Sequence, residues 1–336
     1  MRIDEIAGQK TAVTHLKNAL IKNQIAQAYM LIGEPGMGKK TIATAFAESI
    51  LCEERKPGEY EHCGSCQSCH QVETGNHPDC IFVTHEKPEV ITVDEIREQL
   101  VSDVEIKPYQ GSRKVYIVPD AEKMNEQAQN ALLKTLEDPP EYAVIILLAA
   151  NADMMLQTIL SRSIKLPLSP LPDEVIEDKL IKNYAQPKYR ASSIVKFARG
   201  NLGRAIEMSE NDDFIEDKNL AAEIMKKVVR TESYQWKDWI DELTGDKDKS
   251  RLSLFLGLFM DYYRDILMFK SGAGRDKLMF ADEGDVIAEE AFEYDFEGLK
   301  NCVEAIEDCK AKIRSNVKPS LALENLFITF SRNYSE

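Results

Sequence analysis

The sequence predicts an α/β protein built on a doubly wound parallel sheet, followed by a region made only of helices. Two apolar runs, K-V-Y-I-V at 114–118 and A-V-I-I-L-L-A-A at 143–150, are typical of strands buried on both faces. Between them, the segment 125–137 has the pattern of a helix that ends before Pro139 and Pro140. Strands that alternate with helices indicate parallel pairing, which places ligand sites at the carboxyl ends of the strands.

A glycine-rich phosphate loop follows the first expected strand, at 28–31. The segment 32–41 reads I-G-E-P-G-M-G-K-K-T, and the helix-like T-I-A-T-A-F-A-E-S-I begins at its last residue. Gly33, Gly38 and Lys39 fit the G-x-x-x-x-G-K pattern, in which backbone N–H groups and one ammonium group surround phosphate oxygens. The loop therefore predicts a phosphate site.

The metal half of this site is defective. Phosphate loops need Ser or Thr after the lysine because its hydroxyl holds Mg²⁺, but the chain has Lys40 there. Thr41 carries a hydroxyl one residue late, about 100° around a helix. After the strand at 114–118, Pro119 stands where the metal-binding Asp is required, unless Asp120 serves the metal instead. We expect little or no ATPase activity, with weak or absent ATP or ADP binding by Gly33, Gly36, Gly38, Lys39, Lys40 and Thr41.

Four of the seven cysteines form a compact pattern, C-x10-C-x2-C-x2-C. Four thiolates satisfy tetrahedral zinc and leave no coordination position open, so the pattern predicts a structural zinc site. The C-x2-C-x2-C part is also typical of iron–sulfur ligation, but the C-x3-C-P segment that would follow is missing. His70 and Cys80 remain as reserve ligands. The four predicted ligands are Cys52, Cys63, Cys66 and Cys69.

Composition excludes some classes of function. A net charge of −15 argues against a general nucleic-acid binder, so any DNA contact must be local or made through partners. No stretch approaches the roughly 18–20 apolar residues of a membrane span. The first residues, M-R-I-D-E-I, lack the apolar core of a signal peptide, and a cytoplasmic protein is expected.

The proline-rich segment 166–172 separates the expected α/β region from the helices. We predict a nucleotide-binding-type domain at 1–168 with a zinc insert around 52–69. A small helical domain is expected at 169–211, and an all-helical domain at 212–336. The apolar run L-S-L-F-L-G-L-F-M-D-Y-Y in the last domain is typical of a core or a subunit interface.

Several motifs together resemble one family. They are I-A-G-Q at 6–9, the phosphate loop, A-L-L-K-T-L-E-D-P-P at 131–140, I-L-S-R-S at 159–163, G-N-L-G-R-A at 200–205 and N-V-K-P-S-L-A-L-E-N-L at 316–326. With these motifs the chain resembles, over its whole length, the clamp-loader branch of the AAA+ ATPases. The resemblance also implies a zinc module after the phosphate-loop helix, a helical lid and an oligomerising C-terminal collar.

The resemblance assigns roles to three further residues. Arg162, in a Ser-Arg-Ser segment where the family has Ser-Arg-Cys, is implied to present its guanidinium to ATP held by a neighbouring subunit. Such an arginine finger is worth roughly 10³–10⁵ in rate. Arg204 matches the lid arginine that senses phosphate in its own subunit; if hydrolysis is lost, the alternative is that it only packs or binds a surface carboxylate. Asn151 lies near the family's polar sensor position.

The implied function is that of a non-hydrolysing subunit of the DNA polymerase III clamp loader in DNA replication. Its partners would be gamma/tau and delta subunits, the sliding clamp and, within the complex, primer-template DNA. The alternative is a competent gamma-like ATPase subunit, in which Thr41 or a water replaces the lost hydroxyl. A third possibility is a zinc-stabilised adaptor whose phosphate loop is a structural relic. Alone, the chain is not expected to be an ATPase.

Overall fold

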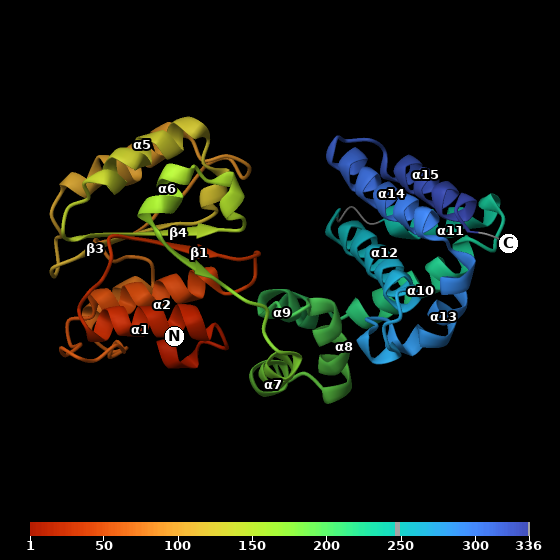
Figure 1. Ribbon diagram of the computed structural model, residues 1–336, viewed down its shortest axis with the longest axis horizontal. Helices are drawn as coiled ribbons and strands as arrows, with labels where there is room; N and C mark the ends of the chain where they lie inside the picture. The colour runs from red at the N-terminus through yellow and green to blue at the C-terminus, as the bar shows by residue number, and fades with distance from the viewer. Residues whose placement is uncertain (246–248, 335–336) are drawn as a thin grey trace. The chain divides into compact units, whose positions relative to one another are not determined.

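The computed structural model describes residues 1–245 and 249–334, and these form two compact units (Figure 1). The first unit holds Met1–Asp178 together with Gly200–Arg204. The second holds Lys179–Arg199 together with the residues from Ala205 onward. A chain of 336 residues is long enough for each unit to bury a core of its own.

A five-stranded parallel sheet forms the centre of the first unit, with strand order β2-β3-β4-β1-β5. The doubly wound parallel sheet predicted from the sequence is confirmed. After β1 the chain crosses to β2 at one edge of the sheet, and after β4 it crosses to β5 at the other edge. The direction of the connections therefore changes between β1 and β4. Ligands of doubly wound sheets bind at such a position, at the carboxyl ends of the strands. The strands are β1 (Ala28–Ile32), β2 (Cys80–Phe82), β3 (Lys114–Val118), β4 (Ala143–Ala149) and β5 (Ile164–Pro167).

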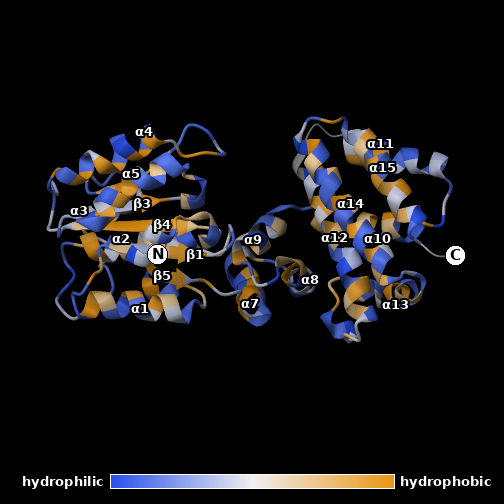
Figure 2. Cartoon of the chain, turned by 45° about the horizontal axis from the view of Figure 1, so that its top comes forward, coloured by the Kyte–Doolittle hydropathy of each residue, from blue (hydrophilic) through white to orange (hydrophobic). Residues whose placement is uncertain are grey.

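Helices cover both faces of this sheet, with α1 and α2 on one face and α5 and α6 on the other (Figure 1). Alternate residues of β1 enter the two cores: Tyr29 and Leu31 pack on the side of α1 and α2, and Met30 packs on the side of α5 and α6. Figure 2 shows the strands as almost wholly apolar and the covering helices as striped. The helices are α1 (Lys10–Ile21), α2 (Lys39–Leu51), α3 (Gln67–Glu73), α4 (Val93–Ile96), α5 (Glu126–Glu137) and α6 (Gln157–Arg162).

The second unit is helical throughout its described residues, as the sequence predicted. Edge-to-face contacts between aromatic rings stabilise its core. The ring centres of Phe197 and Phe280, for example, lie 5.0 Å apart. The apolar run at 252–263 contributes Phe255, Phe259 and two tyrosines to that core. The helices are α8 (Lys188–Ala198), α10 (Phe214–Val228), α11 (Trp236–Gly245), α12 (Lys249–Lys270), α13 (Gly284–Glu293), α14 (Phe296–Arg314) and α15 (Pro319–Arg332), and α7 (Asp173–Tyr184) and α9 (Leu202–Glu210) have residues in both units.

Across residues 1–245 and 249–334, every helix falls short of the length and apolar character that crossing a bilayer requires.

Candidate functional site

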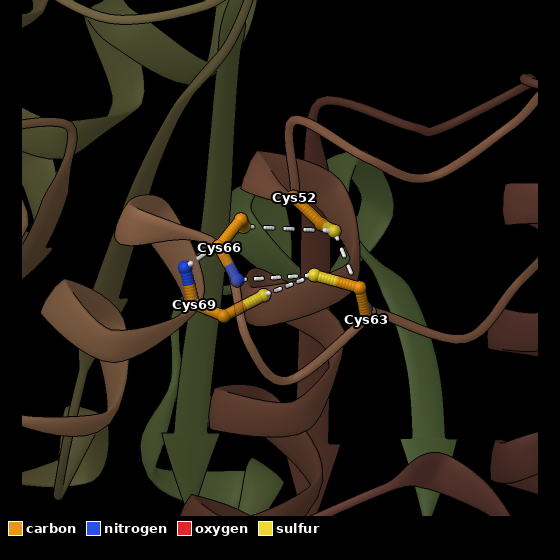
Figure 3. Close-up of side chains that lie close together, drawn as sticks. All are labelled: Cys52, Cys63, Cys66 and Cys69. Carbon is orange, nitrogen blue, oxygen red and sulfur yellow. Dashed lines mark hydrogen bonds between the residues drawn. The ribbon is translucent and has the colours of Figure 1, made fainter.

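The four predicted zinc ligands converge at the end of α2 (Figure 3). Cys52 ends that helix, Cys63 lies in the following loop, Cys66 caps the N-terminus of α3 and Cys69 lies in its first turn. The Sγ atoms of Cys52 and Cys66 are 4.0 Å apart, and those of Cys63 and Cys69 are 3.9 Å apart. Zinc–sulfur bonds of about 2.3 Å in a tetrahedron place sulfurs about 3.8 Å from one another. The cluster therefore fits zinc with little rearrangement.

Backbone N–H groups point at three of these sulfurs. Cys63 Sγ accepts from the N–H groups of Ser65 at 3.4 Å and Cys66 at 3.2 Å. The bond from Ser65 is the main cause that lowers the pKa of Cys63 to about 6, whereas burial raises the pKa of Cys52 and of Cys69. Zinc binds thiolates, and such N–H···S bonds hold negative sulfurs and orient them. The two reserve ligands, His70 and Cys80, lie outside this cluster.

A buried histidine connects the zinc cluster to the sheet. His77 Nδ1 accepts from the N–H of Asp79 at 3.0 Å, so its Nε2 carries the proton and donates to Ser68 Oγ at 2.8 Å. Ser68 in turn donates to the carbonyl oxygen of Leu51, at 2.7 Å, next to the first cysteine. Burial lowers the pKa of His77, which favours the neutral ring that this chain of bonds requires.

The phosphate loop joins β1 to α2. Gly36 and Gly38 have φ angles of +86° and +87°, which L side chains rarely adopt, so these turns favour glycine. The ammonium group of Lys39 donates to the carbonyl oxygens of Gly33 and Glu34, the latter at 3.1 Å. Burial lowers the pKa of Lys39. Carbonyl oxygens of the loop itself thus accept hydrogen bonds from the Lys39 ammonium group.

The G-N-L-G-R segment packs directly against the phosphate loop. The side-chain amide of Asn201 donates to the carbonyl oxygen of Pro35 at 2.8 Å, and its oxygen accepts from the N–H of Arg204 at 3.1 Å. The N–H of Gly203 donates to the carbonyl oxygen of Gly36 at 2.9 Å. A Cβ atom at Gly203 would lie 2.5 Å from the Cα of Gly36, so only glycine fits this close approach. Arg204 in this segment was predicted from its motif, whereas the contacts of Asn201 and Gly203 were not predicted from the sequence.

The acidic side of the site is the turn after β3. Asp120 adopts a left-handed conformation with φ +48°, and its carboxylate pairs with Lys123 at 3.1 Å. Pro119 precedes it and offers no side-chain oxygen for a metal. Glu122, which was not predicted from the sequence, buries a carboxylate oxygen that has no hydrogen-bond partner among the described residues. The charges of Glu122 and Asp120 both act to raise the pKa of Lys39, against the larger effect of burial.

The structure places the remaining candidates around this loop. Lys40 is exposed, and its ammonium lies 5.6 Å from the ring centre of Phe82 at the end of β2. Thr41 is exposed on α2, and Arg204 is half-buried at the start of α9. Asn151 follows β4, and its side-chain oxygen accepts from the backbone N–H two residues further on, at 2.9 Å.

Arg162 lies at the opposite end of the strands. It is the last residue of α6, two positions before Ile164, which is in register with Tyr29 at the amino end of β1. The phosphate loop begins at Gly33, beyond the carboxyl end of β1. By this register Arg162 is level with position 27, which is six residues before Gly33 along the chain. At about 3.3 Å per residue, roughly 20 Å of sheet separates the two sites.

The guanidinium of Arg162 is exposed and held by two contacts. One terminal nitrogen donates to Glu137 Oε1 at 3.0 Å and the other to the carbonyl oxygen of Thr158 at 3.1 Å. The arginine borders a hollow of about 370 Å³. Glu137 was not predicted as a site residue, although it lies within the A-L-L-K-T-L-E-D-P-P motif. The hollow is lined by Ala26, Gln27, Ala28, Leu136, Pro139, Ser161, Arg162, Ser163 and Ile164.

Comparison with known proteins places these features in a family. The sequence model described as DNA polymerase III, delta subunit, matches residues 8–172, and the one described as DNA polymerase III, delta subunit, C terminal, matches residues 222–332. The chain is 28% identical over 321 residues to DNA polymerase III subunit delta′ of Bacillus subtilis, with 93% of each chain covered. It is 39% identical over 150 residues to DNA polymerase III subunit delta′ of Pseudomonas aeruginosa, with 44% of each chain covered.

Among solved structures, a DNA polymerase III gamma subunit-related protein from Thermotoga maritima aligns with 95% of this chain and 98% of its own. The TM-score is 0.46 and the sequence identity is 19%.

Proposed function

We propose a function from one premise: the chain belongs to the DNA polymerase III delta subunit family, and within it is delta-prime-like. On that premise it acts as the delta-prime-type subunit of a clamp loader. It hydrolyses little or no ATP itself. Instead it donates Arg162 to ATP bound by a neighbouring gamma/tau subunit, and so couples ATP turnover to loading of the sliding clamp on primer-template DNA.

The position of Arg162 is the observation that carries this proposal. The arginine is exposed at the amino ends of the strands, roughly 20 Å from the chain's own phosphate loop. A guanidinium spans only a few ångströms, so Arg162 acts on a phosphate only if another molecule supplies it. Charge that develops on a transferring γ-phosphoryl group is what an arginine in this situation stabilises.

The second part of the proposal, the lack of hydrolysis, is supported by the acidic turn and by Lys40. Mg²⁺ in phosphate-loop enzymes is held by a hydroxyl after the lysine and by an aspartate at the end of a strand. Here the first position is Lys40 and the second is Pro119, while the nearby Asp120 pairs with Lys123. Phosphoryl transfer depends on that metal for positioning and for charge neutralisation.

Zinc would have a structural role in this protein. Cys52, Cys63, Cys66 and Cys69 would hold it with no open coordination position, so it would supply folding energy to the insert and no catalysis. We assign the remaining partners, delta and the sliding clamp, from the family alone. The cytoplasm, where replication complexes of this family would act, is the proposed location.

The test is a clamp loader reconstituted from this chain with its gamma/tau and delta subunits. Arg162→Ala should lower DNA-stimulated ATP turnover by at least about tenfold, because a trans-acting arginine is worth roughly 10³–10⁵ at the one site it serves. Arg162→Lys should restore little, since an ammonium cannot reproduce the planar fork of donors. Assembly, followed by gel filtration, should be unchanged. Undiminished turnover with Arg162→Ala would overturn the proposal.

The gamma-like alternative predicts a different result from the isolated chain. A competent ATPase subunit would turn over Mg²⁺-ATP by itself, and Lys40→Thr would raise that rate only modestly. The proposal expects no turnover above background from the natural sequence. Lys40→Thr alone should not create activity either, because Pro119 still withholds the carboxylate.

A further inference from the structure

The side chain of Arg162 is held in place by one acidic residue from another helix. Glu137, the last residue of α5, accepts from a terminal guanidinium nitrogen at 3.0 Å. The other terminal nitrogen donates to the carbonyl oxygen of Thr158, one turn earlier in α6. An arginine side chain has four rotatable bonds to its planar group, so two contacts on different elements restrict its orientation far more than one would.

The element that carries Glu137 is itself firmly anchored. Its neighbour Leu136 is buried in the core on that face of the sheet. The helix stops at once, because Pro139 and Pro140 cannot continue it. The side-chain amide of Gln27, just before β1, donates to the carbonyl oxygens of Pro139 at 3.0 Å and Pro140 at 3.4 Å. The backbone of Glu137 therefore has a fixed position relative to the sheet.

The arginine still has capacity for a ligand. A guanidinium has five N–H donors, and Glu137 and Thr158 take one from each terminal nitrogen. Three donors remain, and the arginine borders a hollow of about 370 Å³. Side-chain exposure is 36% for Arg162 and 55% for Glu137. An ion pair so open to water contributes little to stability, so a large effect of Glu137 on activity would have to come from orientation.

We propose that Glu137 is a positioning residue that holds the Arg162 guanidinium in the orientation required to reach a triphosphate on a neighbouring subunit. This inference rests on the proposed function of Arg162. Glu137 itself touches no substrate. Its carboxylate aligns one edge of the guanidinium, and the donors on the remaining edges meet the γ-phosphoryl oxygens as charge builds on them.

The test uses the same reconstituted clamp loader with Glu137→Ala and Glu137→Gln. Misplacement of a catalytic group by about 1 Å can cost about 10²-fold, so Glu137→Ala should lower the kcat of DNA-stimulated ATP turnover by about tenfold or more. The KM for ATP should change by less than about twofold, because the arginine acts in the transition state. Glu137→Gln keeps a carbonyl acceptor and should stay within about threefold of the natural protein.

A matched variant separates orientation from a general charge effect. Asp94→Ala removes an exposed carboxylate that pairs with Arg97 at 3.8 Å in the same unit, and it should leave kcat unchanged. Thermal unfolding of the isolated Glu137→Ala chain should match that of the natural chain within about 2 °C, as expected for an exposed pair.

The possible outcomes divide cleanly. If Arg162→Ala slows turnover and Glu137→Ala does not, or speeds it, the positioning role is wrong while the proposed function stands. If Arg162→Ala has no effect, the proposed function fails and the inference fails with it. If Glu137→Gln is as defective as Glu137→Ala, an acceptor is not what the arginine requires, and the positioning role is again overturned.

Discussion

Replacing Gly203 by alanine should loosen the contact between the G-N-L-G-R segment and the phosphate loop. A Cβ at this position would lie 2.5 Å from the Cα of Gly36 and 2.7 Å from its carbonyl oxygen. Carbon atoms pack at about 3.5–4.0 Å, so the two backbones must separate by about 1 Å. That movement breaks the 2.9 Å bond from the N–H of Gly203 to the Gly36 carbonyl.

The magnitude follows from three terms. The lost hydrogen bond costs about 1 kcal/mol and the overpacking about 1–3 kcal/mol. Gly203 lies in the first turn of α9, so alanine also gains at most about 0.5–1 kcal/mol of helix propensity. The net loss in the free energy of unfolding should be about 1–3 kcal/mol. As a control, a Cβ at Gly257 in α12 would meet nothing within 4 Å beyond its chain neighbours and the backbone of its own helix, so Gly257→Ala should stabilise by about 0.5–1 kcal/mol.

Urea unfolding distinguishes the two units because both tryptophans, Trp236 and Trp239, lie in the second unit. Tryptophan fluorescence therefore reports that unit, whereas far-ultraviolet circular dichroism reports both. We expect Gly257→Ala to move the fluorescence transition to higher urea. Gly203→Ala should move a dichroism transition to lower urea and leave the fluorescence midpoint nearly unchanged. A Gly203→Ala chain as stable as the natural one, with Gly257→Ala behaving as expected, would refute the close-packing argument.

Two further predictions concern the zinc insert. Metal analysis should find one zinc per chain. Cys66→Ser should lose the zinc together with several kcal/mol of apparent stability, whereas the control Cys302→Ser, outside the cluster, should keep the zinc. Because burial lowers the pKa of His77 below its usual 6.5, the unfolded chain binds that proton more readily. Stability from this group is full above about pH 6.5 and falls as pH drops toward the lower folded-state pKa. Melting temperatures of the natural chain and of His77→Gln, measured from pH 7.5 to 5, should converge on acidification, and a constant difference would contradict this assignment.

Much of the fold could be predicted from short segments of the sequence. The run K-V-Y-I-V coincides with β3, and the run at 143–150 ends one residue beyond β4. These segments are continuous apolar stretches that only a strand covered on both faces can bury. The four cysteines could also be predicted from a local pattern, because the spacing of zinc ligands along the chain is itself the signal.

Contacts between distant segments could not be found in this way. Glu137 and Arg162 are 25 residues apart, and nothing in either segment specifies that α5 and α6 end side by side. The second glycine of G-N-L-G-R, Gly203, is visible in the sequence, but the reason for it is the backbone of Gly36, more than 160 residues earlier. Such contacts depend on the order and register of the strands, and these cannot be read from any one segment of the sequence.

The register of β1 with β5 is the strongest physical argument for the proposed sharing of an active site between subunits. One end of β1 carries the phosphate loop, and the other end is level with Arg162. A single chain cannot bring these two ends together without unfolding its central strand, because hydrogen bonds to both β4 and β5 fix that strand along its length. Copies of such a fold placed side by side can align the arginine end of one with the phosphate end of the next. Under the proposed function, a chain with a defective metal site would lose only the use of its own loop, and Arg162, paired with Glu137, would still serve the neighbouring subunit.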